Sequence, residues 1–211
     1  MISADLQQVS TVAGDGTRGH RDGAAAQATF TSPGGLAVLP DGRVLVSQEH
    51  CIRVLSADLQ QVTTVAGTGA AGHQDGAGAQ ARFRVPQGMV VLPDNRVLVA
   101  DWGNNRIRVL SADLQEVTTV AGDGEEGYRD GAAAQARFCG PNGLALLFDG
   151  SVLVADFDND RIRMLSADLQ QVTTVVGGGG EGDDDGAAAD ATLTAPSRLL
   201  ALFDGSVLVS T

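Results

Sequence analysis

Residues 85–124 read V-P-Q-G-M-V-V-L-P-D-N-R-V-L-V-A-D-W-G-N-N-R-I-R-V-L-S-A-D-L-Q-E-V-T-T-V-A-G-D-G. Four short segments in this stretch are rich in Val, Ile, Leu or Thr: Met89–Leu92, Val97–Ala100, Ile107–Leu110 and Val117–Ala121. Tight turns separate them, for example at Pro93-Asp94-Asn95. Short β-branched runs bounded by turn residues predict β-strands, so this stretch predicts four of them.

The rest of the chain repeats this unit. The tract Ser-Ala-Asp-Leu-Gln begins at positions 3, 56, 111 and 166, with spacings of 53, 55 and 55 residues. The first spacing is shorter because two residues are missing from the turn between the second and third strands, and loops tolerate such changes. A period of this length with four strands is typical of a β-propeller blade. We therefore expect one domain, residues 1–211, with repeats at about 3–55, 56–110, 111–165 and 166–211.

The two ends of the chain carry complementary parts of one repeat. The chain opens with the end of a third strand and a fourth strand at Val9–Ala13, and it ends with a first strand, Leu199–Leu202, and a second, Val207–Ser210. We predict an all-β propeller of four-stranded antiparallel blades, with a ring closed by N- and C-terminal strands that share one blade. The competing model is an open arc that a second copy completes, which would make the protein a homo-oligomer.

The repeats resemble a known family. Each linker reads Gly-x-Gly-x-x-Gly-x-x-Asp-Gly, at 14–23, 67–76, 122–131 and 177–186, and Pro-x-Gly-Leu-Ala and Leu-Val-Ala-Asp-x-x-Asn-x-Arg-Ile-Arg motifs follow in several copies. Over essentially its whole length the chain is similar to NHL repeats with long linkers. The resemblance implies a propeller. It leaves function open, because NHL propellers serve as protein-binding platforms, RNA binders and scaffolds for lyases and lactonases.

The glycine-rich linkers superficially look like nucleotide-binding loops. A dinucleotide site would need a strand–helix–strand unit and would not occur four times in one chain. We instead expect glycines with positive φ in compact loops, with Asp22, Asp75, Asp130 and Asp185 capping backbone amides. The Ala and Phe or Leu residues that follow would anchor each linker to the core.

Charge limits the class of partner. Acidic residues number 26 against 14 basic ones, all of them Arg, and the net charge is −12. Such a surface repels phosphate, which argues against nucleic acid and anionic membranes and favours basic peptides or divalent metals. No apolar run is long enough for a transmembrane helix and no signal peptide is visible, so we expect a soluble protein. The sequence leaves its cellular compartment open. Cys51 and Cys139 occupy different repeat positions and are interpreted as incidental thiols.

Metal-dependent chemistry has little support in the sequence. The chain has three His, too few for the His-rich metal centre of a propeller enzyme, and no nucleophile motif. Asp158 and Asp160 are the best candidates for a metal, which would be calcium, but Arg161 follows them and no bidentate Glu is placed downstream. We expect a solvated turn there and no cofactor. A metal-dependent hydrolase or lyase is the alternative to a non-catalytic protein.

Residues that differ between repeats are free to take a function. The linkers and the turns between second and third strands should lie on one side of a propeller, here called the linker face. Candidate binding residues on it are Trp102, Tyr128, His20, His73, Arg18, Arg129 and Phe157. Trp and Tyr are frequent interface anchors, although Trp102 could equally cover the core. We expect a scaffold that binds a protein or peptide; a second alternative is an amplified or constructed repeat without a ligand.

Overall fold

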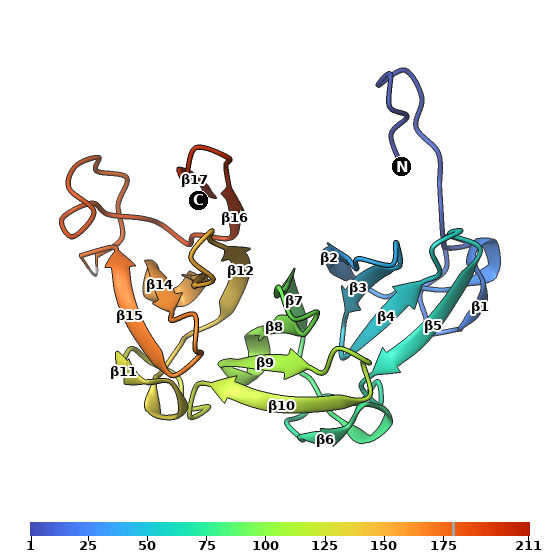
Figure 1. Cartoon of the computed structure of the whole chain (residues 1–211), viewed down its shortest axis with the longest axis horizontal. Helices are drawn as coiled ribbons and strands as arrows, with labels where there is room; N and C mark the ends of the chain where they lie inside the picture. Colours follow the sequence, from blue (N-terminus) through green and yellow to red (C-terminus); the bar gives the residue numbers. More distant parts are fainter. Residues whose placement is uncertain (179) are drawn as a thin grey trace.

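The computed structural model of the chain describes residues 1–178 and 180–211; Gly179, in the fourth linker, lies outside the described residues. The protein is all-β, with three five-stranded antiparallel sheets and a terminal hairpin that stand as blades in an open arc (Figure 1). The first sheet holds β1 (Gly23–Ala24), β2 (Pro33–Val38), β3 (Val44–Gln48), β4 (Cys51–Leu55) and β5 (Gln61–Ala66).

The second and third sheets repeat this pattern. The second holds β6 (Gly76–Ala77), β7 (Pro86–Val91), β8 (Val97–Asp101), β9 (Arg106–Leu110) and β10 (Glu116–Ala121). The third holds β11 (Gly131–Ala132), β12 (Pro141–Leu146), β13 (Val152–Asp156), β14 (Arg161–Leu165) and β15 (Gln171–Val176). The terminal hairpin consists of β16 (Arg198–Ala201) and β17 (Val207–Ser210).

Within residues 1–178 and 180–211 the helical content is limited to single 3₁₀ turns. Three follow the short outer strands: η1 (Ala25–Gln27), η2 (Gly78–Gln80) and η4 (Ala133–Gln135). Two lie in turns between second and third strands: η3 (Trp102–Asn104) and η5 (Phe157–Asn159). Among the described residues, none of these helices has the length and apolar character needed to cross a membrane.

The four strands predicted from residues 85–124 correspond to β7, β8, β9 and β10. The expectation of four-stranded blades is incomplete, because each full sheet has a fifth strand at its outer edge. That strand is the last part of the glycine-rich linker: Gly76 and Ala77 pair with Val117 and Glu116. The linker thus closes the hydrogen-bonding edge of the blade that follows it.

The predicted shared terminal blade is not formed. Within the described residues β16 and β17 pair only with each other, and Val9–Ala13 is not a strand. The N-terminal arm instead folds back on itself through a bridge between Ile2 and Val9 and projects away from the first blade (Figure 1). In each complete blade the fourth strand pairs with the third strand. The predicted shared blade would combine a first, a second and a fourth strand, with only the end of a third strand between them. The N-terminal segment therefore has no third strand with which to form backbone hydrogen bonds.

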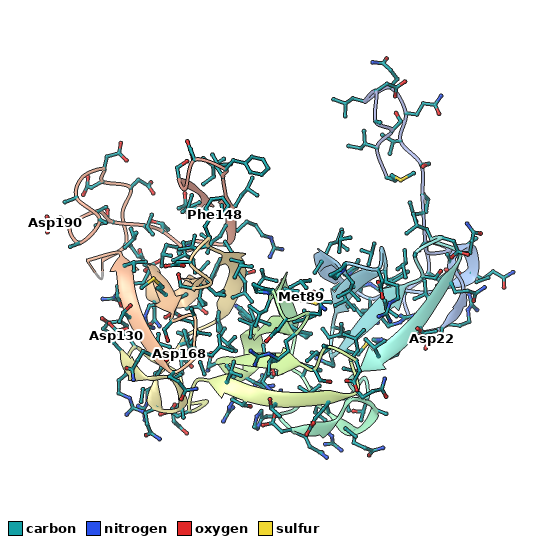
Figure 2. The ribbon with its side chains drawn as sticks, in the orientation of Figure 1. Asp22, Met89, Asp130, Phe148, Asp168 and Asp190 are labelled. Atoms are coloured by element: carbon teal, nitrogen blue, oxygen red, sulfur yellow. The ribbon has the colours of Figure 1, made fainter. Side chains whose placement is uncertain are left out.

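Neighbouring blades bury their faces against each other. We call the face of a blade toward the preceding repeat its leading face and the opposite one its trailing face. Side chains alternate between the two: in β3, Leu45 points to the second blade and Val46 to the leading face. The seam between the first and second blades buries Leu45 and Val54 against Met89 and Val99, and Figure 2 shows Met89 within it. Three such seams hold most of the apolar core, and a fourth, smaller cluster lies on the leading face of the first blade around Val46 and Leu55.

Glycine sets how closely the innermost strands β2, β7, β12 and β16 approach at the centre. A Cβ atom on the glycine of one blade would come within 2.3, 2.5 or 2.6 Å of a carbonyl oxygen of the next blade; the pairs are Gly35 with Gln87, Gly88 with Asn142, and Gly143 with Ser197. Real Cβ atoms do not come this close to a backbone oxygen. The position therefore requires glycine because of the next blade, not because of its own dihedral angles.

We predict that Gly88→Ala destabilises the fold by about 1–3 kcal/mol, the usual cost of overpacking, because Asn142 O must move away. Urea unfolding would measure the loss. Gly186→Ala is the matched control, since nothing lies within 4 Å of its added methyl. Equal stability of the two variants would show that the neighbouring blade can move away from the added methyl group without loss of unfolding free energy.

Candidate functional site

Each complete blade buries one arginine on its third strand. Arg53, Arg108 and Arg163 are fully buried, and each guanidinium lies about 5 Å from the ring of the Phe that ends its linker: 5.0, 5.0 and 5.2 Å for Phe30, Phe83 and Phe138. In the Arg-Ile-Arg motif, strand alternation sends the Ile to the trailing face and the second Arg to the leading face. A buried charge is costly unless it is paired and hydrogen-bonded, so its surroundings decide whether the blade is stable.

The surroundings of Arg108 satisfy it fully. Nη1 donates to Asp101 Oδ2 at 2.8 Å and to Arg82 O at 3.0 Å. Nη2 donates to Gln74 O at 2.9 Å, and Asp75 accepts from both Nε and Nη2. One guanidinium therefore ties the end of the second strand to the end of the linker at Gln74–Asp75 and to Arg82 just beyond it.

Three of the four linker aspartates, Asp22, Asp75 and Asp130, also cap backbone amides, as expected from the sequence, whereas Asp185 accepts no amide among the described residues. Asp75 accepts the amide of Thr119 at 3.0 Å, and Asp130 accepts that of Thr174 at 3.0 Å. The carboxylate thus joins the buried arginine of its blade to the fourth strand of the same blade. The sequence analysis found the cap and missed the arginine, which lies 33 residues away along the chain.

The first blade departs from this arrangement. Gln48 stands where the other blades have Asp101 and Asp156, so Arg53 keeps only the carboxylate of Asp22, at 2.6 Å. Its Nε has no partner among the described residues. His20 fills the space beside Gln48: its Nδ1 lies 2.5 Å from Gln48 Nε2, and its Nε2 lies 3.0 Å from Glu49 Oε2. His20 therefore takes part in the blade's internal bonding.

The equivalent linker positions, His73 and Tyr128, also contact their own blades. His73 Nε2 lies 3.0 Å from Thr119 Oγ1. The Tyr128 hydroxyl accepts from Thr174 Oγ1 at 3.1 Å, and its ring lies 4.1 Å from the Arg161 guanidinium. Tyr128 is nevertheless 46% exposed, so part of its ring is open to a partner.

The other candidates do not converge with these residues. Arg129 pairs with Asp123 at 2.7 Å, Phe157 is half-buried in η5, and Arg18 is exposed beside the leading face of the first blade. Asp160 is occupied in holding the next linker, because its Oδ1 accepts the amide of Ala195 at 2.8 Å. No three His, Cys, Asp or Glu side chains lie together as a metal-binding group in the part of the chain that the structure describes.

A hollow between the second and third blades does gather candidate residues on the linker face. This interblade hollow, of about 230 Å³, is lined by Arg84, Trp102, Gly103, Asn105, Glu126, Cys139, Gly140 and Asp158. Trp102 comes from η3, Asp158 from η5, and Glu126 and Cys139 from the linker between the two blades. The sequence analysis singled out Trp102 and Asp158 and missed Glu126. Cys139, interpreted there as incidental, lies in the wall.

The hollow carries two carboxylates, Glu126 and Asp158, against one arginine, Arg84. Burial and the charges of Glu126 and Asp160 raise the pKa of Asp158. Burial, followed by the hydrogen bond and charge of Glu126, raises the pKa of the Cys139 thiol to about 12, so the thiol stays protonated. The described ion pairs nearby use Asp123, Asp130 and Asp156, and leave out Glu126 and Asp158. Carboxylates without a cation are suited to receive one.

The comparisons agree with the repeat architecture. A family model described as the NHL repeat matches residues 83–110, which include β7, β8 and β9. Residues 83–110 thus carry an NHL repeat, as the sequence predicted. It is 29% identical over 164 residues to protein SUPPRESSOR OF QUENCHING 1 of Arabidopsis thaliana, covering 72% of this chain and 16% of that protein. It is 29% identical over 177 residues to NHL repeat-containing protein 2 of Bos taurus, covering 76% of this chain and 24% of that one. This NHL-repeat chain thus spans at most about a quarter of these relatives.

Solved propeller-like structures share the fold. A putative gluconolactonase matches with a TM-score of 0.60 at 15% identity, over 86% of this chain and 56% of that one. A streptogramin B lyase matches with a TM-score of 0.57 at 14% identity, over 90% and 51%. At these identities the likeness concerns the fold alone. The predicted NHL-repeat family is confirmed.

We predict that Arg108→Met destabilises the protein by roughly 3–5 kcal/mol, because Asp101 is then left buried without its cation. Arg96→Met is the matched control: Arg96 pairs with Asp94 on the surface at 2.7 Å, and loss of such a pair costs about 0–1 kcal/mol. Chemical unfolding of both variants measures the difference. Similar losses would mean that the buried network does not stabilise the blade.

Acid should weaken the linker attachment. Partial burial acts to raise the pKa of Asp130, but hydrogen bonds from Arg163 and Thr174 and the Arg163 charge outweigh it and leave that pKa below its ordinary value of 3.8. A lowered folded-state pKa contributes stability above the unfolded value of about 3.9 and loses it as the pH falls through the folded pKa. We expect Asp130→Asn to flatten the fall of unfolding free energy below about pH 4. An unchanged slope would remove Asp130 from the acid response.

Proposed function

We propose that this protein is a non-catalytic binding module that holds a basic segment of a protein or peptide on its linker face. One observation carries the proposal: the interblade hollow places the sole tryptophan, Trp102, beside Glu126 and Asp158, two carboxylates left out of the described ion pairs.

The chemistry of the hollow suits a guanidinium or ammonium group. A cation over an indole face gains about 0.5–2 kcal/mol, and charge-assisted hydrogen bonds to carboxylates add to this. Arg84 also lines the hollow, beside Gly103, so the cation would enter on the side of Glu126 and Asp158. The net charge of −12 attracts basic partners at longer range.

Catalysis has weaker support in the same hollow. Its thiol, Cys139, stays protonated far above neutral pH, whereas a nucleophilic cysteine needs a lowered pKa. The likeness to a lyase and a putative lactonase concerns the fold. A chain in the structure of a nidogen/laminin complex is also similar in fold, with a TM-score of 0.56 at 16% identity, over 82% of this chain and 54% of that one.

Trp102 fluorescence tests the proposal directly, because the chain has one tryptophan. The probe is the peptide acetyl-Gly-Arg-Gly-amide, with acetyl-Gly-Gln-Gly-amide as the neutral comparison. We expect a saturable change with the Arg peptide that weakens as salt rises, since salt screens exposed charges. An equal response to both peptides would contradict a cation site.

Variants locate the binding within the hollow. Glu126→Gln and Asp158→Asn should each weaken binding of the Arg peptide by about 5–10-fold, or about 1 kcal/mol. Glu125→Gln is the matched control, because Glu125 is the adjacent exposed acid and does not line the hollow. If all three variants bind alike, net charge and not the hollow attracts the peptide.

A further inference from the structure

On the innermost strand β2, the leading face of the first blade exposes apolar side chains that are buried at the same positions elsewhere in the chain. Leu36 on β2 is 68% exposed, whereas the residues at the same repeat position, Met89 and Leu144, are 7% and 8% exposed. Val38 beside it is 67% exposed. In the second and third blades the preceding blade covers these positions.

An apolar hollow of about 400 Å³ lies on this same face. Ala13, Phe30, Pro33, Val46 and Leu55 contribute to its wall, and Arg18 stands among them. Val46 and Leu55 are themselves 6% and 7% exposed, and the residues at the same positions of the second blade, Val99 and Leu110, are 0% exposed beneath the preceding blade. The face is therefore built as one side of a seam.

The terminal hairpin presents the other side of such a seam. Leu208 on β17 is 56% exposed, whereas the leucines at its repeat position, Leu45, Leu98 and Leu153, are 0%, 0% and 7% exposed. Leu200 on β16 is 58% exposed. Leu45 covers the leading face of the second blade, so Leu208 has the side chain and position needed to cover an equivalent face.

We propose that a second copy of this chain docks head to tail, with the trailing face of its β16–β17 hairpin on the leading face of the first blade. The surfaces that would meet are the same two that meet at every internal seam, so the contact continues an interface already present in the fold. They lie on the two end units of the arc, which do not meet in this structure (Figure 1). A contact between unlike faces is heterologous and either closes a ring or extends a chain.

Arg198 explains why one chain does not close on itself. It occupies the repeat position of Gly35, Gly88 and Gly143, and its Nη1 donates to Asn142 Oδ1 at 2.8 Å. At the internal seams a Cβ there would lie 2.6 Å or less from the next carbonyl. The docking blade must stand farther from β16 than the internal blades stand from one another. Closure into four blades needs the tightest approach at the centre, so this spacing favours a second protomer.

Light scattering coupled to size exclusion tests the contact. We expect the wild type at about twice its chain mass of 21.5 kDa, or larger if the contact extends into a chain. Leu36→Asp and Leu208→Asp should each be monomeric, because each removes one side of every seam. Mixed in equal amounts, the two variants should form a dimer, because the intact hairpin of the first fits the intact leading face of the second. Recovery on mixing also shows that both variants are folded.

Phe148→Asp is the matched control. Phe148 is 78% exposed and sits in the turn between β12 and β13 of the third blade, so it belongs to neither of the two faces that would meet, and this variant should associate like the wild type. Arg198→Gly should shift the protein toward monomer, because it removes the side chain that keeps one chain from closing on itself. A wild-type monomer of 21.5 kDa at every concentration, or no complex from the mixed variants, would overturn the proposal.

Discussion

A buried guanidinium in each complete blade is the constraint on which the rest of the structure depends. Removing a charge from water costs several kcal/mol, and the cost is offset only when carboxylates and carbonyls surround it. Arg108 and Arg163 each meet two aspartates and two linker carbonyls. The linker is therefore held in place by the same bonds that satisfy the arginine, and a long glycine-rich loop becomes a rigid part of the blade.

This attachment separates the structural residues of the linker from those that can vary. The repeated Asp and Gly positions hold the loop, while neighbouring positions such as 73, 126 and 128 are occupied by other residue types in other repeats. The interblade hollow arises where one variable linker faces two variable turns. In the first blade the network around the buried arginine differs. Gln48, hydrogen-bonded to His20, stands where the other blades have an aspartate, and Arg53 pairs with one carboxylate, that of Asp22.

The seams impose a direction on the chain. The trailing face of each blade packs on the leading face of the blade that follows, and the glycines of the innermost strands allow these two faces to approach closely. Since the repeats are so alike, the two outermost faces keep the complementarity of the internal ones. Arg198 is the departure that makes the end seam different from the others.

The sequence by itself determined the blade, its four main strands, the capping aspartates and the family, because these depend on local patterns that recur at a fixed period. The variable positions Trp102 and Asp158 were also visible from repeat comparison. Only the tertiary structure decided which aspartate pairs with which arginine, that the linker supplies a fifth strand, that Glu126 and Cys139 join Trp102, and that the ring stays open. Those features arise between segments far apart in the chain, where packing distances, rather than local propensity, select the partners.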